Sequence, residues 1–513
     1  MAVARVVPQA LQGQPGQPFA PAREHALEAS DVRIARRARD AMARRDLVED
    51  ERARSHHRIQ DLLDRLGPGA GRRRAERDVE AARGALAVRA ALGAGDVLVS
   101  FVQYRRYGRG VDLAPPVLSY GAFVTRPHEG VAFVPLADAA RIDSLVARWR
   151  KVLLLERSGV TPRASVADYR AAALRLRREI WDPIEPRLRG AVRVSLVPDG
   201  ALHLVSFAAL PARGGAYLLE SGPLLHYVTA ERDLVAPPSD VASRGLLALG
   251  DPDFDTAASM GPGEESAAKA PASDRSTARL RSASACRAFE DLRFAPLPAS
   301  GREVDDLAAP FDPADTLRLR GAAAREGAVK ELAHGRRVLH LATHAFFLGD
   351  ECPSALTASR SDGEASPGAQ APLLRAGLAL AGANRREAAP PGGEDGILTA
   401  EEIAGLDLRG MEWAVLSACG TGVGEIAAGE GVLGLSRAFR VAGAGTTIMS
   451  LWAVDDEATR RWMRGLYRSR FEEGKTTDEA VYAASLESLR ERRSRGRSTH
   501  PFYWAGFIAS GSW

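Results

Sequence analysis

The sequence EWAVLSACGTGVG, residues 412–424, places a cysteine directly after an apolar run and follows it with three glycines in five positions. A short, nearly all-apolar run that ends at glycines is typical of a strand buried in a parallel sheet. We therefore predict a strand over residues 412–419 with Cys419 at its tip. Four roles are open for Cys419 at this point: a buried small side chain, a disulfide partner, a metal ligand or a nucleophile.

Apolar runs and helical patterns alternate along the chain on both sides of this strand. Further strands are predicted over residues 316–321, 337–344 and 446–454, with helical patterns between them. Such alternation indicates an α/β fold in which a mostly parallel sheet is flanked by helices on both faces. Function in such sheets lies at the carboxyl ends of the strands.

A histidine stands at the end of another predicted strand, because RVLHLATH ends at His344. An imidazole that titrates near neutral pH can take the proton of a thiol and later return it to a leaving amine. The glycines after Cys419 leave the backbone N–H groups of Cys419 and Gly420 able to stabilise an oxyanion. The N–H of Ala345, from the histidine strand, is a third candidate. Taken singly, a buried cysteine or a satisfied polar histidine is the commoner explanation, so the catalytic pair is a hypothesis at this point.

The cysteine count removes two of the four roles. The chain has three cysteines, Cys286, Cys352 and Cys419, with no C-x-x-C spacing. An odd number without paired spacing supports neither a disulfide framework nor a structural zinc site. HLATH, residues 340–344, lacks the glutamate of a zinc peptidase motif, and we interpret His340 as a buried sheet residue. We expect no metal.

One glycine motif invites a cofactor interpretation. GEGVLG, residues 429–434, matches G-x-G-x-x-G. A dinucleotide-binding motif follows its strand immediately, whereas about ten residues separate this one from Cys419. We therefore expect no cofactor.

Composition bounds the class of protein. The chain has 513 residues, 45% of them hydrophobic and 26% charged, and a formal net charge of +4. Its length favours two or three folding units, and the small net charge does not indicate a nucleic-acid groove. The sequence shows no apolar stretch of signal-peptide or membrane-spanning length. We expect a cytoplasmic protein that binds neither membranes nor nucleic acid.

Changes in composition divide the chain into five parts. Proline, glycine and glutamine dominate its start, a charged helical pattern comes next, and a small, polar segment separates two α/β patterns. We expect a disordered tail over 1–22, a helical region over 23–94, an amino-terminal α/β half over 95–255, an exposed loop or linker over 256–291 and a second α/β half over 292–513.

Several of these stretches resemble one known family. VLHLATHAFF, PLLRAGLALAGANR, DGILTAEEIAGLDLRG, the run from LSACGTGVG to SLWAVDD and the closing HPFYWAGFI are similar to the CHAT domain, a caspase- and separase-like cysteine peptidase family of clan CD. The resemblance implies a caspase-like fold, preceded by a pseudo-caspase-like α/β half, with His344 as general base and Cys419 as nucleophile. The nucleophile stands in SACGT, and Ala345 stands where caspases have glycine, so caspase-type specificity for aspartate is not expected.

The resemblance also implies a substrate cleft and a biological setting. The loop SLWAVDD, which contains Trp452, Asp455 and Asp456, would wall the cleft, and with Asp395 it could favour a basic residue beside the cleaved bond. A structural role explains these aspartates about equally well, because aspartate is favoured at the cap and first turn of a helix. The family implies a regulated endopeptidase of bacterial defence or programmed cell death that cleaves a protein partner, one encoded in a neighbouring gene, and that is activated through its amino-terminal helices. The alternative is a catalytically silent CHAT-fold scaffold or binding protein.

Overall fold

The computed structural model describes one large unit of the chain. It describes residues 84–107, 115–156, 162–235, 241–256, 292–347, 376–389, 393–417, 419–420, 428–452, 454 and 456–511. The chain divides into two units, Met1–Ala85 and Leu86–Trp513, and nearly all of the described residues belong to the second. Our predictions for the tail, for most of the helical region and for the linker lie outside the described residues. Residues 84–91 are helical.

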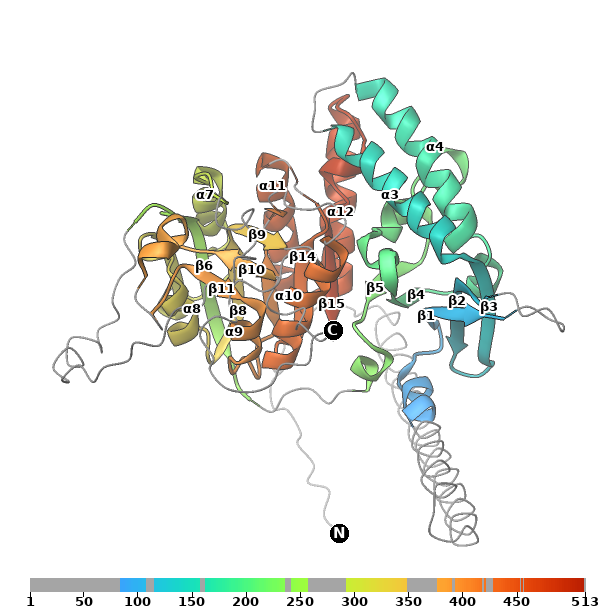
Figure 1. Ribbon diagram of the computed structural model, residues 1–513, viewed down its shortest axis with the longest axis horizontal. Helices are drawn as coiled ribbons and strands as arrows, with labels where there is room; N and C mark the ends of the chain where they lie inside the picture. The colour runs from blue at the N-terminus through green and yellow to red at the C-terminus, as the bar shows by residue number, and fades with distance from the viewer. Residues whose placement is uncertain are drawn as a thin grey trace, which may run out of the picture. The chain divides into compact units, whose positions relative to one another are not determined.

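The second unit is built on an eleven-stranded sheet (Figure 1). Its strands are, in spatial order, β3 (Gly130–Asp138), β2 (Val117–Arg126), β1 (Asp96–Arg106), β4 (Arg193–Val197), β5 (Leu224–Tyr227), β15 (Phe507–Gly511), β14 (Thr446–Ser450), β12 (Trp413–Leu416), β8 (Arg336–Ala342), β6 (Arg244–Pro252) and β7 (Thr316–Gly321). Three neighbouring pairs, β1–β2, β2–β3 and β14–β15, are antiparallel, and the other pairs in this order are parallel. The predicted mostly parallel α/β fold is confirmed.

The central strands are buried because helices cover both of their faces. Every residue of β12 and of β14 is buried. Successive residues of a strand point to opposite faces, so a strand covered on both sides buries all of its residues, including the polar Thr446, Thr447 and Ser450 of β14. His340 of β8 contacts Tyr467 of α11 (Asp456–Tyr467) on one face, whereas Met449 of β14 lines a cavity with Ser436 of α10 (Ala428–Ala442) on the other.

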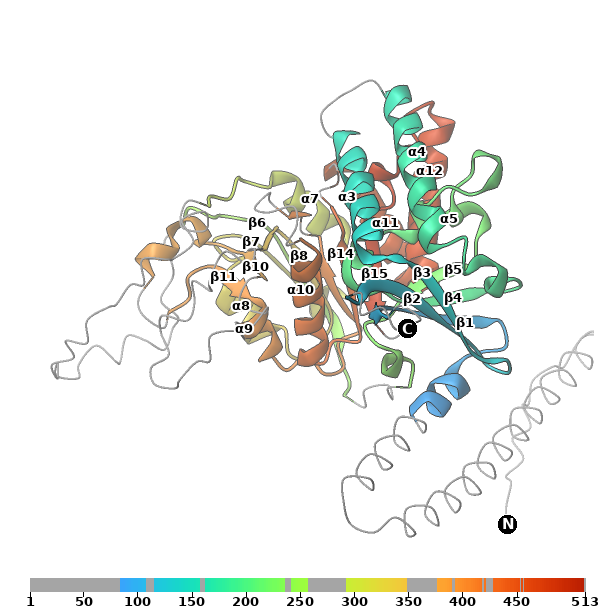
Figure 2. The same cartoon turned by 45° about the vertical axis from the view of Figure 1, so that its right-hand side comes forward.

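The helices of the unit pack against one another in small groups. α11 contacts α7 (Pro298–Asp306) and α12 (Thr477–Ser494). α9 (Ala400–Ala404) contacts α10. α3 (Ala139–Leu155) and α4 (Pro162–Ile180) lie side by side over the amino-terminal strands (Figure 2). α8 (Glu326–Leu332) precedes β8. α8 and α10 lie between the predicted strands, where helical patterns are expected.

A second, four-stranded sheet forms beside the carboxyl ends of the main strands. Its order is β11 (Ile397–Thr399), β10 (Ala376–Ala379), β9 (His344–Phe347) and β13 (Cys419–Gly420). The prediction that single strands run to His344 and to Cys419 is wrong in detail, because β8 ends at Ala342 and β12 ends at Leu416. Thr343 separates β8 from β9, and its hydroxyl donates to the carbonyl of Ala379 in β10. The chain thus leaves the main sheet and joins the smaller one just before each candidate residue.

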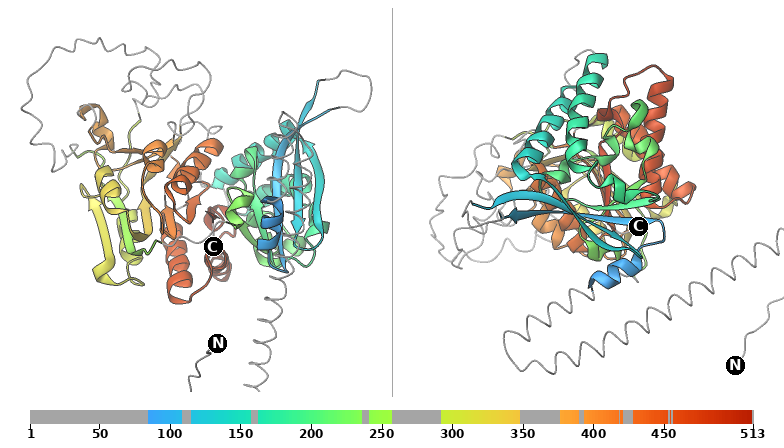
Figure 3. Two further views of the ribbon diagram at one scale, coloured as in Figure 1. Left: turned by 90° about the horizontal axis from the view of Figure 1, so that it is seen from below. Right: turned by 90° about the vertical axis from the view of Figure 1, so that its right-hand side faces the viewer.

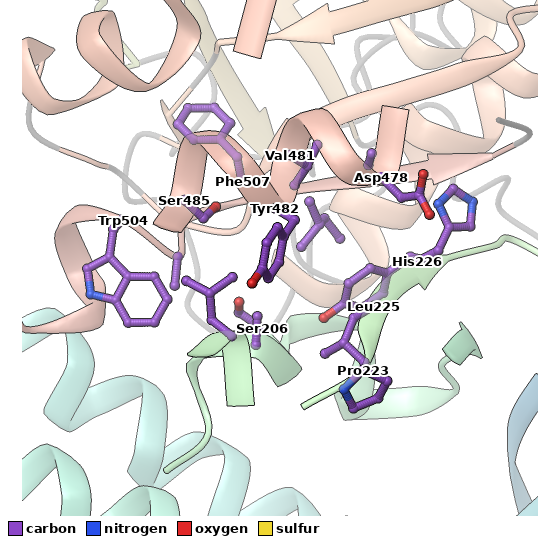
Figure 4. Close-up of a pocket in the computed structure, with 16 residues that line it drawn as sticks. Ser206, Pro223, Leu225, His226, Asp478, Val481, Tyr482, Ser485, Trp504 and Phe507 are labelled. Atoms are coloured by element: carbon purple, nitrogen blue, oxygen red, sulfur yellow. The ribbon is translucent and has the colours of Figure 1, made fainter. Parts of the chain in front are cut away.

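The amino-terminal strands (residues 96–227) and the carboxy-terminal strands (residues 244–511) share the main sheet, and the two halves meet where β5 lies beside β15. β6 falls within the residues 95–255 expected for the amino-terminal half but pairs with β7 and β8 of the other half. A single residue pair, Tyr227 and Ser510, joins these two strands. The strands of residues 96–138, drawn in blue, form the far edge of the sheet (Figure 3). A cavity of about 40 Å³ lies at the junction, lined by residues of both halves such as Leu225 and Tyr482 (Figure 4). Among the described residues, no helix is both long enough and apolar enough to cross a lipid bilayer.

Candidate functional site

His344 and Cys419 are partners in a strand ladder. In the parallel pair β9–β13, His344 lies opposite Cys419 and Ala345 lies opposite Gly420. Neighbouring strands lie about 4.8 Å apart, so the backbones of the two candidate residues are adjacent. The three backbone N–H groups predicted to bind an oxyanion, those of Ala345, Cys419 and Gly420, therefore lie on two paired strands.

The pairing arises from the main sheet below it. β8 and β12 are parallel neighbours, with Leu341 opposite Leu416. From there, each segment continues into the smaller sheet. Because the two segments leave the main sheet at neighbouring positions, the residues that follow them reach β9 and β13 side by side. The carboxyl ends of parallel strands thus bring together two residues far apart in sequence, as expected for this class of sheet.

The imidazole of His344 packs against two aromatic rings that also contact each other, with their centroids 5.8 Å apart. The Phe254 ring centroid is 5.4 Å from that of His344 with an interplanar angle of 38°, and the Phe294 ring stacks at 5.8 Å and 29°. The histidine is 8% exposed. Contacts with both rings restrict rotation of the imidazole.

A backbone carbonyl determines the tautomer of His344. Nε2 lies 2.8 Å from the carbonyl oxygen of Ala295. A carbonyl oxygen only accepts, so Nε2 must carry a proton and donate. In the neutral ring, Nδ1 is then the nitrogen with the lone pair and can accept a proton.

The structure does not bring Asp395 to this pair. Asp395 directly precedes Gly396 and β11, and β11 is at the opposite edge of the four-stranded sheet from β13. Three strand spacings amount to about 14 Å. The Asp395 carboxylate accepts from the backbone N–H of Ile397 at 2.9 Å, and burial raises the pKa of this carboxyl.

The other predicted substrate-binding residues lie in the core or beyond the described part of the chain. Trp452 is 4% exposed, its indole N–H donates to the carbonyl of Phe502 at 3.0 Å, and its ring meets Trp149 edge to face at 6.1 Å. These core contacts account for the indole without a substrate. Asp456 is the first residue of α11, but its side chain and the whole of Asp455 lie outside the described residues.

A network of charges supports the small sheet from below. Lys330 of α8 donates to Glu326 at 2.7 Å, to Glu402 at 2.9 Å and to Glu394 at 3.3 Å. These carboxylates raise the pKa of Lys330 despite its partial burial. Glu326 also accepts from the backbone N–H of Gly396, so the network anchors the chain that enters β11. The i,i+4 spacing of Glu326 and Lys330 predicts one pair of this network. Glu394 and Glu402 come from later parts of the chain, and no spacing predicts their contact with Lys330.

The metal and cofactor interpretations have no counterpart in the described part of the chain. No group of three or more His, Cys, Asp or Glu side chains there is arranged to hold a metal ion. His340 is fully buried, with Nε2 3.0 Å from Glu303 and Nδ1 3.1 Å from the Tyr467 hydroxyl, which confirms its interpretation as a sheet residue. GEGVLG lies within the helix α10, which begins at Ala428, and not in a loop between strand and helix.

Comparison with known families agrees with this architecture. The model of the CHAT domain matches residues 170–512, about two thirds of the chain. The chain belongs to the CHAT domain family. The family match includes β9 and β13, so the paired His344 and Cys419 lie in the CHAT domain.

Individual relatives share shorter regions or lower identity. The chain is 32% identical over 116 residues to human tetratricopeptide repeat protein 28 and 34% identical over 118 residues to the mouse protein of that name; 23% of this chain is aligned in each case. These regions span 4% of the length of either relative.

Two solved structures are also similar to the CHAT protein. One, described as a protease, has a TM-score of 0.35 at 11% identity and covers 67% of this chain and 68% of its own. The Saccharomyces cerevisiae separase–securin complex has a TM-score of 0.42 at 8% identity and covers 89% of this chain and 33% of its own. The family assignment rests on the domain match.

Proposed function

We propose that this CHAT protein is a cysteine endopeptidase in which Cys419 is the nucleophile and His344 the general base. The observation that supports the proposal most directly is the pairing of Cys419 with His344 across β13 and β9. The bond from His344 Nε2 to the Ala295 carbonyl adds to it, because that bond makes Nδ1 the proton acceptor.

The proposed reaction has two halves. His344 takes the thiol proton, and the Cys419 sulfur attacks the carbonyl carbon of the peptide bond while backbone N–H groups stabilise the oxyanion. The C–N bond breaks, the amine leaves with the proton from the imidazolium, and a thioester remains. Water, deprotonated by His344, attacks the thioester and releases the carboxylic acid and the free thiol.

Proteolysis by the purified full chain tests the proposal. A peptide library digested with the wild-type chain is expected to yield cleavage products that Cys419→Ala and His344→Ala each abolish. Cys286→Ala and Cys352→Ala are matched controls and are expected to cleave as the wild type does. Unchanged cleavage in either site variant contradicts the assignment, and intact folding with no cleavage by any form favours the alternative of a silent scaffold.

The same library addresses specificity. We keep a preference for a basic residue beside the cleaved bond as a proposal that rests on Asp455 and Asp456, since Asp395 lies at the far edge of the small sheet. Cleavage after an acidic or a large apolar residue would contradict it.

We further propose a protein substrate, with a role in bacterial defence or programmed cell death and activation through the amino-terminal region. A separate proposal is that the protein cleaves itself within residues 256–291 in an activation step; the alternative is that this segment is a simple surface insertion. Phe254 and Phe294 both contact His344, so the described chain on either side of residues 257–291 lies beside the proposed base. Mass spectrometry of stored protein would support self-processing if fragments from this segment form in the wild type and not in Cys419→Ala; equal fragmentation would refute it.

A further inference from the structure

The groups that hold His344 come from two separate segments of the chain. Phe254 follows β6, whereas Phe294 and Ala295 precede α7. Neither segment is a strand or helix at these positions, so the fold alone does not determine their positions. A residue that fixes both segments would also fix the imidazole.

Asn384 makes such contacts with the second segment. Its side-chain carbonyl accepts from the backbone N–H of Phe294 at 2.8 Å, and its side-chain amide donates to the Phe294 carbonyl at 3.0 Å. Two bonds to one residue resemble those of a neighbouring strand, and they fix the peptide groups on both sides of Phe294. The ring of Phe294 and the carbonyl of Ala295, the next residue, are the groups that contact His344.

Asn384 also holds the first segment. Its backbone N–H donates to the Phe254 carbonyl at 2.9 Å, and its side-chain amide donates to the carboxylate of Asp255 at 3.0 Å. The turn before it depends on Gly382, whose φ of 90° is in the left-handed region that favours glycine. The Gly382 N–H donates to the Asp253 carbonyl at 3.0 Å.

Asparagine is the side chain that satisfies these partners. The site needs one acceptor toward the Phe294 N–H and two donors toward the Phe294 carbonyl and Asp255, and the planar amide supplies both. Aspartate has the same shape but would turn an oxygen toward a carbonyl and a carboxylate. Asn384 is the one asparagine among the 513 residues of the chain.

We propose that Asn384 is a positioning residue, which keeps the Ala295 carbonyl and the Phe294 ring on His344 and thereby maintains Nδ1 as the base for Cys419. The inference rests on the proposed pairing of His344 with Cys419. Loss of the asparagine contacts releases the acceptor of Nε2, so the imidazole loses both its tautomer and its orientation. For metal-binding histidines, removal of the supporting hydrogen-bond partner costs about 10- to 100-fold in affinity or activity, and we expect a loss at the low end of that range here.

The pH dependence of Cys419 alkylation by iodoacetamide tests the inference without a known substrate. The rate is followed for the Cys419 peptide by mass spectrometry, with N-acetylcysteine in the same mixture as an ordinary thiol. The wild-type rate is expected to rise at a lower pH than that of N-acetylcysteine, because an adjacent imidazolium stabilises the thiolate. In Asn384→Ala this rise is expected to move toward the ordinary thiol, with alkylation at pH 7 slower by about tenfold.

Two further variants separate positioning from folding. Asn384→Asp keeps the shape and the acceptor for the Phe294 N–H, and it is expected to show the same pH shift without a cavity. Arg385→Ala changes the exposed neighbour on the same short helix, η10 (Ala383–Ala388), and is expected to match the wild type. A purely structural role would lower the unfolding temperature of the Asn384 variants and leave the pH profile of their folded form unchanged.

The outcomes distinguish the inference from the function on which it rests. A low-pH rise in the wild type that is lost in both Asn384 variants supports the inference. The same rise retained in both variants overturns the role of Asn384 and leaves the proposed function standing. A wild-type Cys419 that reacts like N-acetylcysteine overturns both.

Discussion

At Trp452, experiment can distinguish a substrate contact from a core contact. Trp452→Phe removes the bond from the indole N–H to the Phe502 carbonyl, and we expect the free energy of unfolding to fall by about 1–3 kcal/mol, since a buried acceptor loses its donor. The alkylation rate of Cys419 is expected to stay unchanged. Urea unfolding and the alkylation assay measure the two effects. Altered peptide specificity at unchanged stability would show instead that Trp452 contacts substrate.

The residues around the candidate site differ in how far they can be predicted from the sequence. His344 and Cys419 are recognisable because both follow apolar runs that form neighbouring parallel strands. Phe254 and Ala295 have no such signal, since a backbone carbonyl acts regardless of its side chain and an aromatic residue in a loop has no periodicity. Asn384 carries one readable sign, which is its uniqueness in the chain.

Among the elements, strands and helices are predicted well from the sequence and their ends less well. β8 and β12 each stop two or more residues before the predicted tip, because the chain changes sheets within a continuous apolar pattern. Side-chain periodicity reports burial and not the identity of the strand's neighbour, so such a change cannot be read from it. The change of sheet is what pairs His344 with Cys419.

Thr343 holds the chain where it changes sheets. Its hydroxyl donates to the Ala379 carbonyl, and the residue is 2% exposed. Thr343→Val keeps the shape and removes the donor, so we expect the free energy of unfolding to fall by about 1–3 kcal/mol. Thr343→Ser, which keeps the hydroxyl, is the matched control and should lose less. A lower free energy of unfolding in urea for Thr343→Ser than for Thr343→Val would contradict this role.

In the molecule as a whole, the two halves form one sheet and are stabilised by contacts across their junction. His500 of the carboxy-terminal half is fully buried against the Tyr169 ring of the other half, with centroids 4.8 Å apart. Burial lowers the pKa of His500 to about 4. The family resemblance predicted two halves, but contacts between residues so far apart in sequence follow no local pattern.

The pKa of His500 makes the stability of the molecule sensitive to acid. In the unfolded chain the imidazole takes up a proton below about pH 6.5, whereas in the folded protein it does so only near pH 4, so stability is retained above pH 6.5 and lost as pH falls toward 4. The loss from this residue is about 3 kcal/mol, from 1.36 kcal/mol for each pKa unit.

His500→Asn removes this titration and keeps an acceptor for the Phe502 N–H, which His500 Nδ1 accepts in the wild type. We expect the variant to be less stable at pH 7.5, through lost packing, but to lose less stability than the wild type between pH 6.5 and 4. Unfolding temperatures over this range measure the effect. Parallel curves for the two proteins would contradict it.

Activation of Cys419 by His344 underlies the whole proposed function, and the alkylation of Cys419 in His344→Ala is its sharpest test. We predict that the wild-type thiol reacts at a lower pH than N-acetylcysteine and that the variant reacts as N-acetylcysteine does, while both proteins remain folded. Identical pH profiles for the wild type and His344→Ala would contradict this activation.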